Sequence, residues 1–193
     1  MAGLRVVGGA LSGRRFASKI AAATRPTSDR VREAVASAVE SRGGFVGACV
    51  LDLFAGTGAM AIEALSRGAS RAVLVEKDRQ AIRAIEESLA SLGLRDRASV
   101  LAVDLAGAPA SVAMKLAATG VSFDRVLIDP PYAEVALVPP LLDALRGLFA
   151  PGALVVLEHP GKATPTLGAD FETLTQKRYG DSAVLFARYA PAP

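Results

Sequence analysis

The residues best suited to chemistry in this chain are carboxylates that end short apolar runs. Asp52 precedes the turn Ala55-Gly56-Thr57-Gly58, Glu76 lies 20 positions after Gly56, and Asp104 follows the apolar run 99–103. Glycines in such a turn let the backbone approach a ligand, and an acidic residue after the next strand can bind ribose hydroxyls. Asp104, the third carboxylate, can accept a hydrogen bond from an adenine amino group. Together, the three carboxylates would surround a bound adenosine.

The glycine turn alone leaves two adenosine cofactors open. Gly56-x-Gly58-x-x-Ala61, with Glu76 at the expected distance, also fits the degenerate dinucleotide pattern of an NAD-dependent oxidoreductase. Asp52 favours S-adenosylmethionine, because a carboxylate before the turn would oppose a pyrophosphate but can bind an ammonium or sulfonium group. In a third interpretation, the glycines and acidic ends are only helix entries and caps.

The most specific motif is Asp129-Pro130-Pro131-Tyr132, directly after an apolar run that ends at Ile128. Two prolines cannot continue a strand ladder or enter a helix interior, so the motif predicts a fixed turn at the rim of a pocket. The exocyclic amine of a nucleobase is a poor nucleophile because its lone pair is delocalised into the ring. If Asp129 and the Pro130 carbonyl each accept one N–H, the lone pair can face a methyl donor, while Tyr132 stacks on an extruded base. The alternative is a proline-stiffened surface turn.

These motifs together resemble those of class I S-adenosylmethionine-dependent methyltransferases that modify amino groups of nucleic acids. The segment Arg25-Pro26-Thr27-x-Asp29-Arg30-Val31-Arg32-Glu33 resembles the RsmD family more narrowly, and the resemblance runs from about Arg5 to Tyr189. That family methylates the N2 amine of a guanine in bacterial 16S ribosomal RNA. The Asp-Pro-Pro-Tyr motif is shared with adenine-N6 methyltransferases of RNA or DNA, which are the alternative of the same class.

The resemblance implies a role for each motif residue. It places the cofactor against Asp52, Phe54, Gly56, Thr57, Gly58, Glu76, Lys77, Asp104 and Leu105, and the target base against Asp129, Pro130, Pro131 and Tyr132. No metal is expected, because one Cys and one His cannot build a conventional zinc site.

Basic residues are concentrated near the N-terminus. Through residue 33, seven basic against two acidic residues give +5, whereas fifteen basic against seventeen acidic residues give −2 for the remaining chain. A basic arm on a slightly acidic body predicts a polyanion partner, and a merely solvated terminus is the alternative. We expect RNA contacts from Arg5, Arg14, Arg15, Lys19, Arg25, Thr27 and Arg30. For Thr27, a simple helix-cap role is equally open.

A mostly parallel sheet is needed to bring these residues together. From residue 46, short apolar runs alternate with helical patterns, which predicts an α/β fold with a mostly parallel sheet of seven strands and helices on both faces. The resemblance implies that this is the Rossmann-like fold of the class I methyltransferases. We expect strands at 49–54, 72–76, 99–103, 125–129, 154–158, 171–179 and 183–189, and helices at 28–41, 58–67, 79–92, 110–119 and 138–149. The last two strands have no helix between them, so they should form an antiparallel hairpin that closes one edge.

The domain organisation follows from the same patterns. Residues 1–26 should form a basic hairpin extension, with strands at 4–7 and 14–17, and residues 27–193 the methyltransferase domain. Cys49 alone cannot form an intramolecular disulfide, and no apolar run approaches the roughly 18 residues of a membrane span. We therefore expect a cytoplasmic protein. The resemblance further implies a substrate of 16S RNA within small-subunit ribosomal particles, and we expect the protein to act as a monomer.

Overall fold

The computed structural model describes residues 3–16, 29–162 and 164–192 of the chain. Its strands are β1 (Leu4–Arg5), β2 (Arg15–Phe16), β3 (Cys49–Leu53), β4 (Arg71–Glu76), β5 (Ala98–Ala102), β6 (Phe123–Ile128), β7 (Phe149–Pro160), β8 (Phe171–Tyr179) and β9 (Ser182–Tyr189). Its α-helices are α1 (Asp29–Glu40), α2 (Ala59–Ser66), α3 (Arg79–Leu92), α4 (Pro109–Ala117) and α5 (Val138–Leu145). Short 3-10 turns are η1 (Gly9–Leu11), η2 (Arg95–Arg97), η3 (Tyr132–Leu137) and η4 (Arg146–Leu148).

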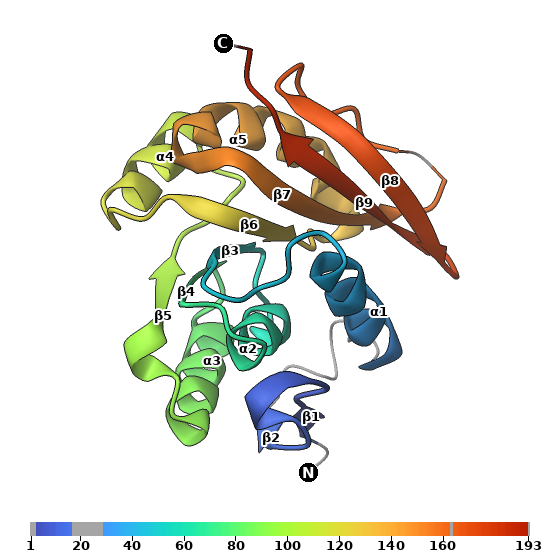
Figure 1. The fold of residues 1–193 in the computed structure, drawn as a ribbon. Coiled ribbons are helices and arrows are strands. Elements are labelled where there is room, and N and C mark those ends of the chain that lie inside the picture. The colour runs from blue at the N-terminus through green and yellow to red at the C-terminus, as the bar shows by residue number, and fades with distance from the viewer. Residues whose placement is uncertain (1–2, 17–28, 163, 193) are drawn as a thin grey trace.

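Seven strands form the main sheet in the order β5-β4-β3-β6-β7-β9-β8. The strands β3 to β7 are parallel, and β9 runs antiparallel to both β7 and β8. The predicted α/β fold is therefore confirmed, and the C-terminal hairpin closes one edge as expected. Within that hairpin, the second strand β9 lies against β7 and the first strand β8 forms the edge (Figure 1).

The expected boundaries between the last helix and the next strand were wrong: the helix expected at 138–149 ends at Leu145, and β7 begins at Phe149 rather than residue 154. The apolar spacing continued through Leu148 and Phe149, so the pattern did not mark the change. The tertiary structure decides it, because the Phe149 ring packs edge-on against Tyr189 at 5.5 Å between ring centroids. Such aromatic pairs add to the stabilisation from apolar burial.

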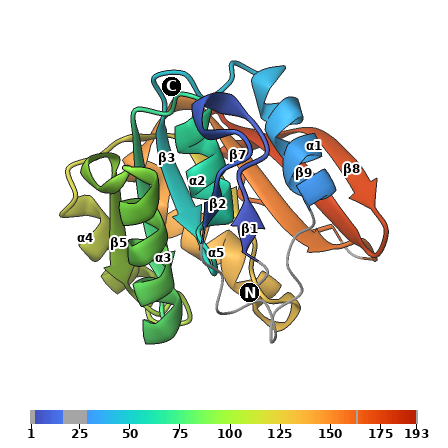
Figure 2. The ribbon, with the colours of Figure 1, turned by 90° about the horizontal axis from the view of Figure 1, so that it is seen from below.

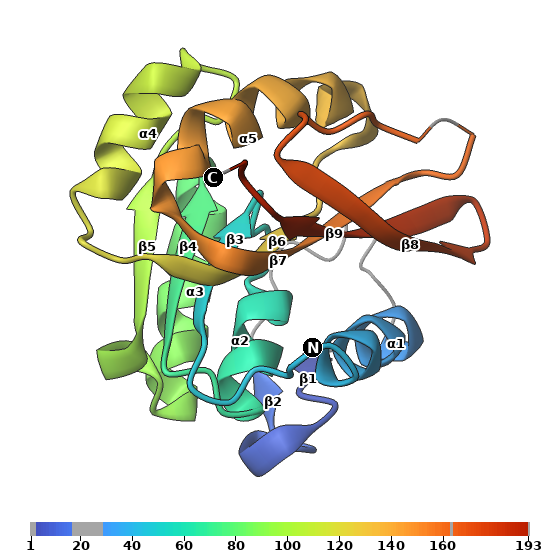
Figure 3. The same ribbon diagram turned by 45° about the horizontal axis from the view of Figure 1, so that its top comes forward.

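Helices cover both faces of the sheet. The helices α1, α2 and α3 lie on one face and α4 and α5 on the other (Figure 3). Helix α3 has the predicted bounds: Asp78 accepts hydrogen bonds from the N–H groups of Gln80 and Ala81, and Gly93 ends the helix with a φ of 71°. In the described part of the chain, no helix is both long and apolar enough to cross a membrane.

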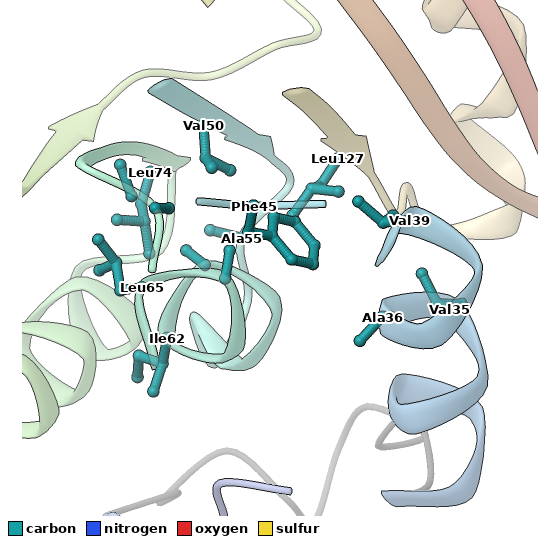
Figure 4. Close-up of a cluster of buried hydrophobic side chains, with 14 of the residues drawn as sticks. Val35, Ala36, Val39, Phe45, Val50, Ala55, Ile62, Leu65, Leu74 and Leu127 are labelled. Carbon is teal, nitrogen blue, oxygen red and sulfur yellow. The ribbon is translucent and has the colours of Figure 1, made fainter. Parts of the chain in front are cut away.

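The core beneath the first face joins α1 and α2 to the sheet (Figure 4). Val35 and Val39 of α1 point toward Phe45 and Leu127, all buried, and Leu65 of α2 lies near Leu74 of β4. Full burial of each such side chain stabilises the fold by about 1.5–3 kcal/mol. This packing fixes α1 against the strands β6, β7 and β9, because Leu127, Val156 and Phe186 belong to the same core.

The N-terminal hairpin is docked onto this same face (Figure 2). Its strands are shorter than expected, with Leu4 opposite Phe16 and Arg5 opposite Arg15. Val6 and Phe16 are buried in the core that also contains α1, α2 and α3. The basic segment is thus held against the body over its described residues.

Candidate active site

A cavity of about 910 Å³ opens at the carboxyl ends of the parallel strands. Its walls come from the ends of β3, β4, β6 and β7, the segment 103–105 after β5, α1, and the turn between β8 and β9. Open α/β sheets bind ligands at this edge. The volume lies at the upper end of small-molecule sites and leaves room for a cofactor and a second group.

The two glycines after β3 have different surroundings. Gly56, with a φ of 54°, lines the cavity, and a Cβ there would meet only the Phe54 carbonyl, at 3.9 Å. Gly58, with a φ of 71°, lies beneath the turn, where a Cβ would come within 3.1 Å of Leu74 and 3.2 Å of Ile85. Gly56 therefore offers an open backbone surface to a ligand. Gly58 lets α2 pack close to the sheet and is not part of the cavity wall.

Phe54 is the one non-glycine residue with a positive φ, 61°, among those the structure describes. A bulky residue in this region is strained, and such strain is held where the surroundings enforce it. Phe54 lines the cavity beside Ala55 and Gly56. The strained residue thus shapes the wall on which the cofactor was expected.

Asp52 lies at the back of the cavity and is only 3% exposed. Burial raises the pKa of its carboxyl well above the usual value, the charges of Asp129 and Glu76 raise it further, and a hydrogen bond from the Ala61 N–H at 3.1 Å lowers it. A bound cation would offset the burial and the repulsion. The position therefore suits an ammonium or sulfonium group and disfavours a pyrophosphate.

Glu76 connects the end of β4 to the glycine turn. Its Oε2 accepts a hydrogen bond from the Gly56 N–H at 2.8 Å, and its Oε1 accepts from the N–H groups of Lys77 and Asp78, each at 2.8 Å. The carboxylate is thereby fixed at the cavity wall, the position expected for a ribose ligand. Oε2 accepts one hydrogen bond and retains acceptor capacity for a hydroxyl, whereas Oε1 already accepts two.

Lys77 extends across the outer part of the site. Its Nζ lies 3.0 Å from Glu134 Oε1 and 3.5 Å from Asp104 Oδ1. The hydrogen bond to Glu134 is the main cause of a raised pKa at Lys77. Asp104 itself is exposed and accepts a hydrogen bond from the Ala106 N–H, whereas Leu105 is buried. The cavity is lined by Lys77, Asp104, Leu105 and Glu134, in agreement with an adenine-binding end of the cavity formed after β4 and β5.

The segment Asp129-Pro130-Pro131-Tyr132 forms another part of the cavity wall. It follows β6 directly and enters η3, so the two prolines lie between a strand and a turn, where neither interrupts a ladder. Pro130 is buried, whereas Tyr132 is 52% exposed, which is unusual for a large aromatic residue. Tyr132 is therefore available to a partner at the mouth of the cavity.

Several cavity residues were missed by the sequence reasoning, namely Leu4, Val31, Arg32, Met60, Glu134, Glu158 and the turn residues 179–182. Glu158 could have been found, because it ends an expected strand in the same way as Glu76. Tyr179 contacts the core and also lines the cavity, because the pairing of Ser182 with Pro160 places the β8–β9 turn at the end of β7.

The basic residues expected to contact RNA are partly described. Arg5, Arg15 and Arg30 are exposed, and the Arg14 guanidinium donates a hydrogen bond to the Ser91 carbonyl at 2.9 Å. The remaining ones, Lys19, Arg25 and Thr27, lie outside the described residues. Because Arg5 and Arg15 are opposite each other in the hairpin, their side chains share one face.

Comparison with known proteins gives one consistent family. The family model described as "Conserved hypothetical protein 95" matches residues 4–188. "Putative rRNA methyltransferase YlbH" of Bacillus subtilis is 33% identical over 184 residues, which cover 94% of this chain and 96% of the relative. "Ribosomal RNA small subunit methyltransferase D" of Escherichia coli is 32% identical over 183 residues, 93% of this chain and 87% of the relative. A solved structure, "Putative methyltransferase yhhF from Escherichia coli", matches with a TM-score of 0.81 at 30% identity, over 99% of this chain and 100% of that one.

Proposed function

This chain belongs to the conserved hypothetical protein 95 family, the RsmD family, and from that premise we propose that it transfers a methyl group from S-adenosylmethionine to the N2 amine of a guanine in 16S ribosomal RNA. Its fold is that of the class I methyltransferases. The observation that carries the proposal is the position of Asp129 to Tyr132 on the wall of the same cavity as Asp52 and Glu76.

The residues present fit S-adenosylmethionine. Asp52 supplies a buried negative charge near Asp129 and Glu76, Glu76 supplies fixed ribose acceptors, and Gly56 leaves its backbone open to the cavity. Leu105 adds an apolar surface beside Asp104 for an adenine. When bound, the cofactor supplies an electrophilic methyl group on a sulfonium.

The wall formed by the Asp-Pro-Pro-Tyr segment holds the target amine. The Asp129 carboxylate and the Pro130 carbonyl accept its two N–H groups, which directs the nitrogen lone pair toward the methyl donor. Tyr132 stacks on the extruded base, a contact that contributes about 1–3 kcal/mol in related systems. The new N–C bond would form as the bond between the sulfonium and its methyl group breaks, with S-adenosylhomocysteine as the leaving group, and the amine proton, now acidic, would pass to Asp129 or to water. The rate enhancement comes mainly from positioning.

The substrate assignment is supported by the relatives and by the charge of the chain. Both relatives carry names that specify ribosomal RNA, and one specifies the small subunit. The exposed Arg5 and Arg15 present a positive surface for phosphates beside the cavity that includes Leu4. We assign the chain a monomeric state and a substrate within small-subunit ribosomal particles.

The test is methylation by the purified protein of ribosomal particles from a strain lacking it, followed by mass spectrometry of the digested RNA. We expect N2-methylguanosine at one position, whereas N6-methyladenosine would reassign the base.

Asp129→Ala should bind S-adenosylhomocysteine as the wild type does and lose turnover by about 100-fold or more. Retained turnover would refute the role of Asp129. Calorimetry that shows NADH binding and none of S-adenosylhomocysteine would refute the whole proposal.

A further inference from the structure

Asp129 has a carboxylate neighbour on the next strand. The strands β6 and β7 are parallel, and their last paired residues are Ile128 and Leu157, so the next residues are Asp129, directly after the end of β6, and Glu158 within β7. Adjacent strands lie about 4.8 Å apart. Both carboxylates line the cavity, and both also line a small pocket beneath it. The two side chains therefore face one space.

The alternation of the strands explains this shared direction. Leu127 and Val156 belong to the core beneath α1 and α2, whereas Ile128 and Leu157 belong to the core on the opposite face. Successive strand residues point to opposite faces. Glu158 accordingly lies on the face of Val156, toward α1. Asp129, which follows β6, lines the same small pocket as Leu127, Val156 and Val35 of α1.

Glu158 lies on the side of β6 away from the cofactor. In the sheet order, β5, β4 and β3 lie on one side of β6 and carry the cofactor residues, whereas β7 and β9 lie on the other side (Figure 1). Cavity residues on this second side are Glu158, Tyr179 and Ser182, with Val31 and Arg32 from α1. Cofactor binding does not account for them. They form the part of the cavity where a base held by Asp129 has to lie.

Guanine and adenine differ at the atom next to the reacting amine. In guanine, the N2 amine adjoins N1–H, which is a donor. In adenine, the N6 amine adjoins N1, which is an acceptor. An ionised carboxylate only accepts hydrogen bonds, so a carboxylate beside Asp129 pairs with the N1–H of guanine and repels the lone pair of adenine. Enzymes that extrude a base read its Watson–Crick edge in this way.

We infer that Glu158 is the specificity-determining residue for the base, and that it selects guanine by accepting a hydrogen bond from N1–H while Asp129 holds the N2 amine. The inference rests on the proposed methyl transfer to guanine. It assigns Glu158 no part in cofactor binding. One base-edge contact of this kind discriminates by roughly 5- to 150-fold.

The test uses 2-aminopurine, which has the same exocyclic amine but an acceptor at N1. Small-subunit particles are reconstituted with RNA carrying either guanosine or 2-aminopurine riboside at the methylated position, and kcat/KM is measured for both. The wild type should prefer guanine by about 10-fold or more. Glu158→Gln should reduce this ratio at least several-fold, because its amide can also donate to the N1 of 2-aminopurine. Glu158→Ala, which offers no polar group, should also reduce the ratio.

Controls separate this inference from the proposed function. Glu134→Gln removes a carboxylate from the same cavity, and it should keep the wild-type ratio. The absence of O6 in 2-aminopurine affects every variant alike, so it cancels when the ratios are compared. A wild-type ratio in both Glu158 variants, or an equal loss on both bases, overturns the inference while the methyl transfer stands. A wild type that methylates no guanine refutes the proposed function itself.

Discussion

The Glu63 carboxylate accepts a hydrogen bond from the backbone N–H of Val7 at 2.8 Å, across 56 positions of the chain. Its other oxygen accepts from the Gly8 N–H at 2.8 Å and from the Arg67 guanidinium at 2.8 Å. Glu63 lies in α2 and is only 1% exposed. The helix that begins at the glycine turn of the cofactor site therefore also holds the N-terminal hairpin.

Replacing Glu63 should release this hairpin. Glu63→Ala leaves the partly buried N–H groups of Val7 and Gly8 without this acceptor, and the full loss of a buried hydrogen bond costs about 1–3 kcal/mol. For a chain of this size, 1 kcal/mol lowers the melting temperature by about 2–4 °C. We expect a lower melting temperature and faster amide exchange over residues 4–16, measured by calorimetry and mass spectrometry. The exposed Glu86→Ala is the control, and equal exchange in both variants would show that Glu63 is not the anchor.

The exposed pair Arg5 and Arg15 should contribute to RNA binding. Two like charges opposite each other in a hairpin are unfavourable, and contact with phosphates would offset that repulsion. Replacing both with Gln should weaken RNA binding and make it less dependent on salt, because fewer counterions are released. Filter binding at several salt concentrations measures both effects.

The control for this pair is Arg188→Gln, on the far hairpin, where Arg188 is exposed and lies 3.7 Å from Glu172. An unchanged salt slope in the double variant would favour a merely solvated terminus. Point substitutions are preferable to deleting the segment, because deletion would also remove Val6 and Phe16 from the core.

Cofactor affinity should depend on pH through Asp52. Because burial raises its pKa in the folded protein, the folded state retains a proton that the unfolded chain loses near pH 4. Stability without ligand therefore falls as pH rises from about 4 through the raised pKa. Binding of an ammonium group favours the ionised carboxylate, so affinity for S-adenosylhomocysteine should rise over the same interval.

Asp52→Asn is the matched variant for this prediction. It keeps an acceptor for the Ala61 N–H but carries no charge. We expect weaker binding with little pH dependence, and a higher melting temperature of the unliganded protein at pH 8. Calorimetric titrations between pH 5 and 8 measure the affinities. A wild-type pH profile in Asp52→Asn would assign the dependence to another group.

The two turn glycines should respond differently to alanine. Both have a positive φ, which costs an L-residue roughly 1–2 kcal/mol. Gly58→Ala also places a Cβ against Leu74 and Ile85, so its main effect should be a lower melting temperature. Gly56→Ala places the Cβ in the cavity, so its main effect should be weaker cofactor binding. Thermal unfolding and calorimetry compare the two variants, and the opposite ranking would contradict the assignment.

The sequence by itself determined the architecture and predicted that its acidic and Asp-Pro-Pro-Tyr motif residues would meet, as they do around one cavity. Alternating apolar runs and helical patterns predict a parallel sheet, because each strand buried on both faces must be nearly all apolar. Acidic residues that end these runs, as at Asp52 and Glu76, must meet at one edge once the strands are parallel. Glycine favours tight turns and two prolines are rigid, whatever the rest of the fold does. The turn after β3 and the turn after β6 could therefore also be inferred from the sequence.

Only the tertiary structure decided which distant residues join that edge. The strand β7 lies next to β6 and brings Glu158 beside Asp129, and the β8–β9 turn brings Tyr179 to the cavity. The hydrogen bond from the Val7 N–H to Glu63 likewise joins residues that are 56 positions apart. Local spacing carries no information on these contacts, because strand order and long-range docking depend on how the apolar faces of the whole chain are buried together.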